Sequence, residues 1–369
     1  MSRKILRSIQ LAAALAAASA LPALAAKDDA LQMVSIDVEG GGGTLFVTPD
    51  GKSLLIDTGN PEQSRVTGAH PSSERIAAAA NALGVRKIDY LLITHYHGDH
   101  IGGLEGLLAR IPIDTVIDHG ENREITASTQ AGAPEIDIKN PPPGSTAYGY
   151  RQYLKLVGSR HHIVAHPGQV FHIGGMTVTI VAADAKMIAP MPGAGEANPA
   201  CAGMPGMAGN GGEENARSTS SVIAWGKVRI AAFGDLTWDR EKDLFCPNDR
   251  VGKVGVYLAS HHGTALSGSP AMLAALQPVV AIMGNSPRKG DDPERAKTIE
   301  NSPRIQGLWR LHLSANNPQI DGDPNMIANI GSDPAADKTY ALRLRIKKDG
   351  NVTVINERNG FNKSYQVAP

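Results

Sequence analysis

The chain has 369 residues, of which 42% are hydrophobic, so it is long enough for one large domain or two small ones with a proper core. Basic and acidic residues both number 36, and the formal net charge is zero. This balance gives no broad basic surface, so we expect no nucleic-acid partner.

Residues 1–25 have the pattern of a cleaved signal peptide. Three basic residues precede an alanine-rich apolar run, Leu11 to Leu24, which ends in small residues that include Ala25 and Ala26. A retained membrane anchor is the alternative, but the small-residue end favours cleavage. Nothing later is long and apolar enough to span a bilayer. We therefore expect a periplasmic or secreted protein with its domain in residues 27–369.

The two cysteines, Cys201 and Cys246, form an even pair, and an oxidising compartment favours a disulfide between them. Such a bridge would contribute about 4 kcal/mol in the chain-entropy model. Two unpaired thiols remain the alternative.

The first part of the chain reads as strands followed by a helix. Leu31–Val38 alternates like a strand, and Thr44–Thr48 and Lys52–Asp57 flank a Pro-Asp-Gly turn, as in a hairpin. Gly40–Gly43 lacks the Lys and Ser/Thr of a phosphate-binding loop, so we interpret it as a tight turn near the active site. Ser72–Leu83 is a predicted helix.

A buried strand is predicted over Ile88–Ile93, and a dense set of potential metal ligands follows it directly. Its order is His95-x-His97-x-Asp99-His100. Imidazole and carboxylate groups suit Zn²⁺, Mn²⁺ or Fe²⁺. His95 and His97 can share one metal, while Asp99 and His100 can face a second. We expect Gly98 to avoid Cβ crowding where the backbone turns.

Two long insertions are predicted after this motif. A helix over Leu104–Arg110 and a strand over Ile113–Ile117 come first, and the strand ends in Asp118-His119, near the site or in a surface loop. Residues 121–150 and 186–214 are rich in Pro and Gly and read as inserted loops.

Between the insertions we predict a helix through Tyr150–Leu156 and a hairpin over residues 168–181. Four histidines in this region are interpreted as structural rather than as ligands: His161, His162, His166 and His172.

The second half supplies the remaining candidate ligands. A hairpin over residues 220–233 ends in Gly-Asp235, and a carboxylate behind a buried strand is costly unless it is paired or metal-bound. Asp235 therefore looks like a bridge between two metals. The strand Val254–Ala259 delivers His261 and His262, of which one is expected to be a ligand and the other a supporting or proton-transfer group. His262 is slightly preferred, because Gly follows it.

The last third is predicted to form helices over 269–276 and 292–300, a strand over 279–283, and a closing hairpin over 340–355. His312 could reach the cleft, but a core position is the better interpretation.

The His95–His100 motif, with Thr94 and Ile101-Gly102-Gly103 beside it, resembles the signature of the metallo-β-lactamase superfamily. The resemblance implies an α/β fold, a single-domain four-layer αββα sandwich, with metals at the strand ends. It also implies that Asp57 supports the metal-binding loop. Many relatives place a third histidine before the Gly-Asp pair. Here that region holds Asp184, so Asp184 or His119 could replace it, or the first metal could be held loosely.

The hairpin ending in Leu-Ile-Asp57-Thr-Gly, the Gly-Asp235 strand end and Ser-His261-His262-Gly resemble the branch of bacterial DNA-uptake (competence) proteins and phosphorylcholine esterases. We expect an exported hydrolase with two metals, Zn²⁺ or alternatively Mn²⁺ or Fe²⁺, whose activated water cleaves a small ester or phosphodiester. The expected catalytic residues are Asp99, His261 and His262. The alternatives are a β-lactamase or lactonase, a nuclease, and a non-catalytic metal-stabilised binding protein.

Overall fold

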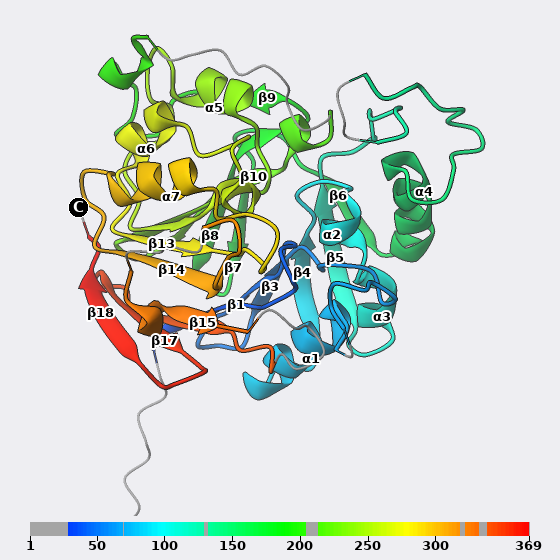
Figure 1. The fold of residues 1–369 in the computed structure, drawn as a ribbon, viewed down its shortest axis with the longest axis horizontal. Helices are drawn as coiled ribbons and strands as arrows, with labels where there is room; N and C mark the ends of the chain where they lie inside the picture. Colours follow the sequence, from blue (N-terminus) through cyan, green and yellow to red (C-terminus); the bar gives the residue numbers. More distant parts are fainter. Residues whose placement is uncertain are drawn as a thin grey trace, which may run out of the picture.

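The structure, a computed structural model, describes residues 29–68, 70–128, 132–203, 213–317, 322–331 and 338–368. Two large sheets pack face to face, and helices cover the outer side of each (Figure 1). The predicted four-layer αββα sandwich is confirmed. The predicted signal peptide lies outside the described residues.

The first sheet has the strand order β18-β17-β16-β1-β2-β3-β4-β5-β6, so the C-terminal hairpin pairs with the N-terminal strand. In this order the strands are β18 (Asn362–Gln366), β17 (Asn351–Asn356), β16 (Leu342–Ile346), β1 (Leu31–Ser35), β2 (Thr44–Val47), β3 (Ser53–Ile56), β4 (Ile88–Leu92), β5 (Ile113–Asp118) and β6 (His161–Val164).

The second sheet has the order β15-β14-β13-β12-β11-β10-β8-β7, with the short β9 paired to β8. These strands are β15 (Ile327–Asn329), β14 (Gly307–His312), β13 (Val280–Met283), β12 (Val256–Leu258), β11 (Val228–Ala232), β10 (Ser220–Trp225), β8 (Met176–Ala183), β7 (Val170–Ile173) and β9 (Lys186–Met187).

Helices cover the two outer faces. Over the first sheet lie α1 (Ser72–Ala82), α3 (Leu104–Leu108) and α4 (Thr146–Val157), with the single turn α2 (Gly98–Ile101) in the metal-ligand loop. Over the second sheet lie α5 (Trp238–Phe245), α6 (Pro270–Leu276) and α7 (Pro293–Glu300). No helix in the described part of the chain is long and apolar enough to cross a membrane.

The core between the sheets is built from apolar side chains of both sheets. Leu31 and Met33 of β1 face it together with Ile223 of β10 and other strand residues. Trp309 of β14 is fully buried and donates its indole N–H to the Tyr365 hydroxyl of β18, 3.0 Å away. This bond joins the two sheets, and burial of such large aromatic side chains contributes strongly to stability.

The topology brings the ends of parallel strands from both sheets together. In the first sheet β3, β4, β5 and β6 run parallel, and in the second β11 to β15 do so. Parallel strands end at one edge, which is where ligand sites form in α/β sheets. The loops after β3, β4, β11 and β12 carry Asp57, the His95–His100 motif, Asp235 and His261-His262.

Two insertions differ in detail from the prediction. Residues 146–149, read as loop, form the first turn of α4, where the Ser145 hydroxyl accepts a hydrogen bond from the Tyr148 N–H. The second insertion contains β9 and a short 3₁₀ turn, Pro199–Cys201. The predicted Cys201–Cys246 disulfide is present and joins this turn to the end of α5.

Candidate metal centre

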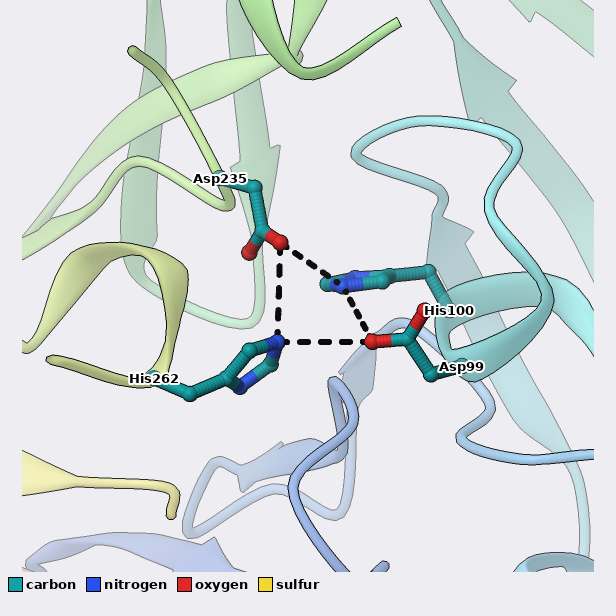
Figure 2. A group of neighbouring side chains, drawn as sticks. All are labelled: Asp99, His100, Asp235 and His262. Carbon is teal, nitrogen blue, oxygen red and sulfur yellow. Dashed lines mark ion pairs between the residues drawn. The ribbon is translucent and has the colours of Figure 1, made fainter. Parts of the chain in front are cut away.

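Four predicted ligands from both halves of the chain converge at the sandwich edge. Asp99, His100, Asp235 and His262 each present one ligand atom, and these atoms lie within 4.8 Å of one another (Figure 2). His100 Nε2 lies 3.3 Å from Asp99 Oδ2 and 3.4 Å from Asp235 Oδ2. His262 Nε2 lies 3.4 Å and 3.5 Å from the same two oxygens. A single ion at their centre could contact all four.

The two histidines of this group are oriented as metal ligands. Their inward nitrogens, His100 Nε2 and His262 Nε2, are buried and have no hydrogen-bond partner among the described residues. Their outward nitrogens are engaged: His100 Nδ1 lies 2.8 Å from Asp57 Oδ2, and His262 Nδ1 lies 3.2 Å from the Gly284 carbonyl oxygen. Metal-bound histidines show this pattern, so the residues present fit a divalent cation.

Asp57 holds the ligand loop from behind. Its Oδ1 accepts a hydrogen bond from the Thr94 N–H at 2.8 Å, and its Oδ2 accepts one from the Thr94 hydroxyl at 2.8 Å. The same Oδ2 faces His100. Asp57 is buried, with a backbone φ of 61°. Asp57 therefore contacts both Thr94, which precedes the candidate ligands, and His100 within them.

His95 and His97 form a second group beside the first. His95 Nε2 and His97 Nδ1 lie 3.0 Å apart, and His95 Nε2 lies 3.9 Å from Asp235 Oδ2. The Asp235 oxygen thus lies between the two groups, where a bridging carboxylate would be. The structure brings together the predicted ligands of both metals.

His261 and His262 both reach Asp235, but they differ toward Asp99. His261 Nε2 lies 3.4 Å from Asp235 Oδ2, whereas His262 alone of the pair also approaches Asp99. Both residues have left-handed backbone φ, 52° and 58°, which turns the two rings into the site. His262, the slightly preferred ligand, is thus the one of the pair that approaches both carboxylates.

The carboxylates and imidazoles of the site shift one another's pKa values. Burial acts to raise the pKa of Asp235, but His261, His262 and His100 hold that pKa well below its ordinary value. Burial likewise acts against ionised Asp99, yet the Lys289 ammonium and His100 hold its pKa well below the usual range. Burial, followed by His100 and His97, lowers the pKa of His95 well below its ordinary value. Ionised carboxylates and neutral imidazoles are the forms that bind metals. Burial acts to lower the pKa of His100, but Asp235, Asp99 and Asp57 hold it well above its ordinary value, so a metal must displace a proton from this ring.

The two substitutes considered for the third histidine engage other partners. Asp184 Oδ1 lies 2.5 Å from an Arg217 nitrogen, and its Oδ2 lies 3.2 Å from Lys186. His119 is buried, with Nε2 3.0 Å from Glu214 Oε2. Neither is among the ligand atoms that the structure brings together.

The other histidines behave as predicted. His161, His162, His166 and His172 are exposed, and His162 pairs with Asp118 at 2.8 Å. His312 is fully buried, 2.9 Å from Asp37 Oδ1 and beside Glu39. The Arg75 guanidinium lies 3.0 Å from Asp37 Oδ2 and 3.5 Å from Glu39 Oε1. Asp37, Glu39 and His312 could also hold a metal ion, but the Arg75 guanidinium already lies within ion-pair distance of both carboxylates, so we interpret this cluster as structural.

Sequence reasoning missed several site residues. Lys289, in the loop after β13, ion-pairs with Asp99 at 2.5 Å. Glu124 and Glu214, in the two insertions, are buried next to His97 and His119. A lone Lys or Glu in a Pro- and Gly-rich loop gives no pattern that would single it out.

A cavity of ≈ 670 Å³ opens beside the metal centre. It is lined on one side by Asp99, Asp235, His261 and Lys289, and on the other by α4, including Tyr148. The cavity is large enough for a small substrate. Together, the fold and the site define a metal-binding αββα sandwich with an open cavity at the ligands.

Comparisons with known proteins agree with this class. A family model described as the metallo-beta-lactamase superfamily matches residues 39–181. The hydroxyacylglutathione hydrolase of Stenotrophomonas maltophilia is 32% identical over 91 residues, covering 25% of this chain and 30% of that protein. The ribonuclease Z of Lachnoclostridium phytofermentans is 33% identical over 102 residues, covering 26% and 29%. These matches show that residues 39–181 resemble the metallo-β-lactamase superfamily, whose members are metal-dependent hydrolases.

The chain spans less than a third of the length of these two relatives. Among solved structures, the metallo-beta-lactamase fold protein YhfI from Bacillus subtilis is similar, with 14% identity and a TM-score of 0.42, covering 76% of this chain and 96% of that one.

Proposed function

We propose that this chain is an exported hydrolase that uses two divalent metal ions, Zn²⁺ above Mn²⁺ or Fe²⁺, to cleave a small ester or phosphodiester. The observation that carries the proposal is the position of Asp235, whose Oδ2 lies 3.4 Å from His100 Nε2 and 3.9 Å from His95 Nε2. Among the branches of the superfamily, the competence-protein and phosphorylcholine esterase branch fits the sequence motifs best.

His95, His97 and Asp235 would hold one ion, and Asp99, His100, Asp235 and His262 the other. Bound ions of this kind lower the pKa of water toward neutrality and polarise the substrate oxygen. The chain's own contribution is positional. Asp235 fixes the spacing of the two groups, and Asp57 fixes the ring of His100. His261 faces the cavity. Because burial lowers its pKa to about 4, its ring is neutral near pH 7 and can accept a proton beside the substrate.

Lys289 makes the cavity suitable for an anionic substrate. It is the only Lys or Arg among the described residues that line the cavity. One ammonium group can orient one carboxylate or phosphate, whereas a nucleic acid tracks along several cations. A small monoanionic ester or phosphodiester therefore fits better than a polynucleotide.

Export is supported by the signal-peptide pattern of residues 1–25 and by the disulfide, since disulfides persist in oxidising compartments. A nuclease is the second candidate, favoured by the similarity to ribonuclease Z. Salt-dependent DNA or RNA binding would be its signature.

The test is hydrolysis of three substrates by the purified, metal-loaded protein: bis-p-nitrophenyl phosphate, a p-nitrophenyl carboxylic ester and nitrocefin. We expect turnover of the phosphodiester or the ester, and its loss in Asp235→Ala. Nitrocefin turnover alone would instead assign a β-lactamase. Bound metal with no turnover of any substrate would favour a metal-stabilised binding protein.

A further inference from the structure

Glu124, from the first insertion, lies against the outer side of a predicted metal ligand. Its side chain is 1% exposed, and its Oε2 lies 3.4 Å from His97 Nε2. The opposite ring nitrogen, His97 Nδ1, is the one that lies 3.0 Å from His95 Nε2. His97 therefore directs its Nδ1 toward His95, where the first metal would lie, and its Nε2 toward Glu124.

The Glu124 carboxylate is held in a fixed orientation. Its Oε1 accepts a hydrogen bond from the Thr146 hydroxyl at 2.6 Å, at the first residue of α4. Its Oε2 also accepts from the Glu214 N–H at 3.4 Å, which comes from the second insertion. Both insertions thus meet at this carboxylate, although 90 residues separate Glu124 from Glu214.

Glu214 secures the surrounding backbone. It is fully buried, and its carboxylate accepts hydrogen bonds from the Tyr96 N–H and the Arg123 N–H, both at 3.2 Å. These two residues immediately precede His97 and Glu124. The backbones that carry the two side chains are therefore tied to one buried group.

We propose that Glu124 is a positioning residue for His97: it accepts the Nε2–H and so leaves Nδ1 as the nitrogen that binds the first metal. The inference rests on the proposed function. A carboxylate behind a ligating histidine fixes the ring and the tautomer, and removing such a group lowers metal affinity about 10- to 100-fold. In this chain the group comes from an insertion rather than from the sandwich itself.

Glu124→Ala and Glu124→Gln test the proposal, with Glu121→Gln as the matched control. Glu121 lies three residues away in the same loop, and its side chain is 76% exposed. For each protein the zinc stoichiometry and the two dissociation constants are measured by chelator competition. The ligand-field spectrum of the Co²⁺-loaded protein is recorded as well.

We expect Glu124→Ala to weaken one of the two sites about 10- to 100-fold and to change the Co²⁺ spectrum, while the other site keeps its affinity. Glu124→Gln should lose less, because the amide oxygen can still accept the Nε2–H. Glu121→Gln should match the wild type.

Unchanged affinities in Glu124→Ala, with two metals bound, would overturn the inference and leave the proposed function standing. Equal weakening of both sites, together with a lower melting temperature of the metal-free protein, would also overturn it, because Glu124 would then be only structural. A wild-type protein that binds no transition metal would overturn the inference and the proposed function together.

Discussion

At the scale of single residues, the backbone of Gly42 lies so close to Asp57 and His100 that a side chain at this position would clash with them. A Cβ at this position would meet Asp57 Oδ2 at 2.4 Å and His100 Nδ1 at 2.7 Å. The glycine-rich turn, interpreted from the sequence as lying near the active site, thus packs directly against the ligand loop.

We predict that Gly42→Ala weakens metal binding by about 10-fold or more, because the methyl group displaces Asp57 from His100. Isothermal titration of the metal-free protein with Zn²⁺ measures this. Gly98→Ala is the control. Outside its chain neighbours and the backbone of its own helix, no atom of the described residues lies within 4 Å of its Cβ position, so the rest of the molecule does not crowd a methyl group at Gly98. Equal affinities for the two variants would contradict the assigned role of Gly42.

Lys289 provides a second prediction at this scale. Its ammonium lines the cavity and faces Asp99, so Lys289→Met removes the one Lys or Arg among the described residues that line the cavity. We expect kcat/KM for an anionic substrate to fall about 10-fold or more, the cost of about 1.5–3 kcal/mol for a charged hydrogen bond. A neutral p-nitrophenyl ester should be affected much less. An equal fall for both substrates would exclude a role in anion binding.

The sequence singled out the candidate ligands but not the residues around them, for a physical reason. Metal binding demands particular side chains at fixed spacing, so the His95–His100 motif can be recognised without a fold. The roles of Glu124 and Lys289 each require only one suitable side chain in a loop, with no fixed spacing to other residues. Their proximity to His97 and Asp99 follows from the packing of segments far apart in the chain.

At the scale of elements, the contact between α5 and α6 contains a buried acid. Glu241 of α5 is fully buried, and its oxygens accept the backbone N–H groups of Gly268 and Ser269, both at 2.7 Å, where α6 begins. Burial outweighs these two hydrogen bonds and raises the pKa of Glu241 to about 7.

This shift predicts a pH dependence of stability. Since the pKa in the folded state lies above that in the unfolded state, the folded protein binds this proton more tightly. The resulting stabilisation is complete below about pH 4.5 and is lost as the pH rises through about 7. It amounts to at most about 3 kcal/mol.

Glu241→Gln removes the pH-dependent part of this stabilisation. The substitution also leaves one backbone N–H without its acceptor, which lowers the unfolding free energy by an amount that does not depend on pH. We expect the difference in unfolding free energy between wild type and variant to shrink as the pH rises from 5 to 8, measured by urea denaturation of the metal-free proteins. A difference that does not change with pH would show that Glu241 titrates normally.

Most elements with clear apolar periodicity were predicted, and the exceptions share a cause. β18 is mostly exposed, with one buried residue, Tyr365, so it lacks a core-facing pattern. β6 begins with two exposed histidines, and its partner β5 supplies the pairing that makes it a strand. α5 is dominated by charged residues and follows the Asp235 loop directly, so the sequence does not mark its start. Tertiary contacts, rather than local propensity, decide these three.

At the scale of the whole molecule, the site exists because two sheets present their strand ends at one edge. The ligand loop after β4 belongs to the first sheet, whereas Asp235 and His262 follow β11 and β12 of the second. The pairing of β1 with β16, about 300 residues apart in the chain, joins the three C-terminal strands to the first sheet. The fold class was predictable from the motif and its strands, but this long-range pairing was not.

The most direct test of the account is the metal content of the purified mature protein and of Asp235→Ala after reconstitution with Zn²⁺. We expect about two ions per chain in the wild type and weakened binding at both sites in the variant, because one carboxylate serves both groups. Elemental analysis after exhaustive dialysis gives the numbers. No bound transition metal in the wild type would contradict the account, and the convergence of these histidines and carboxylates would then need another explanation.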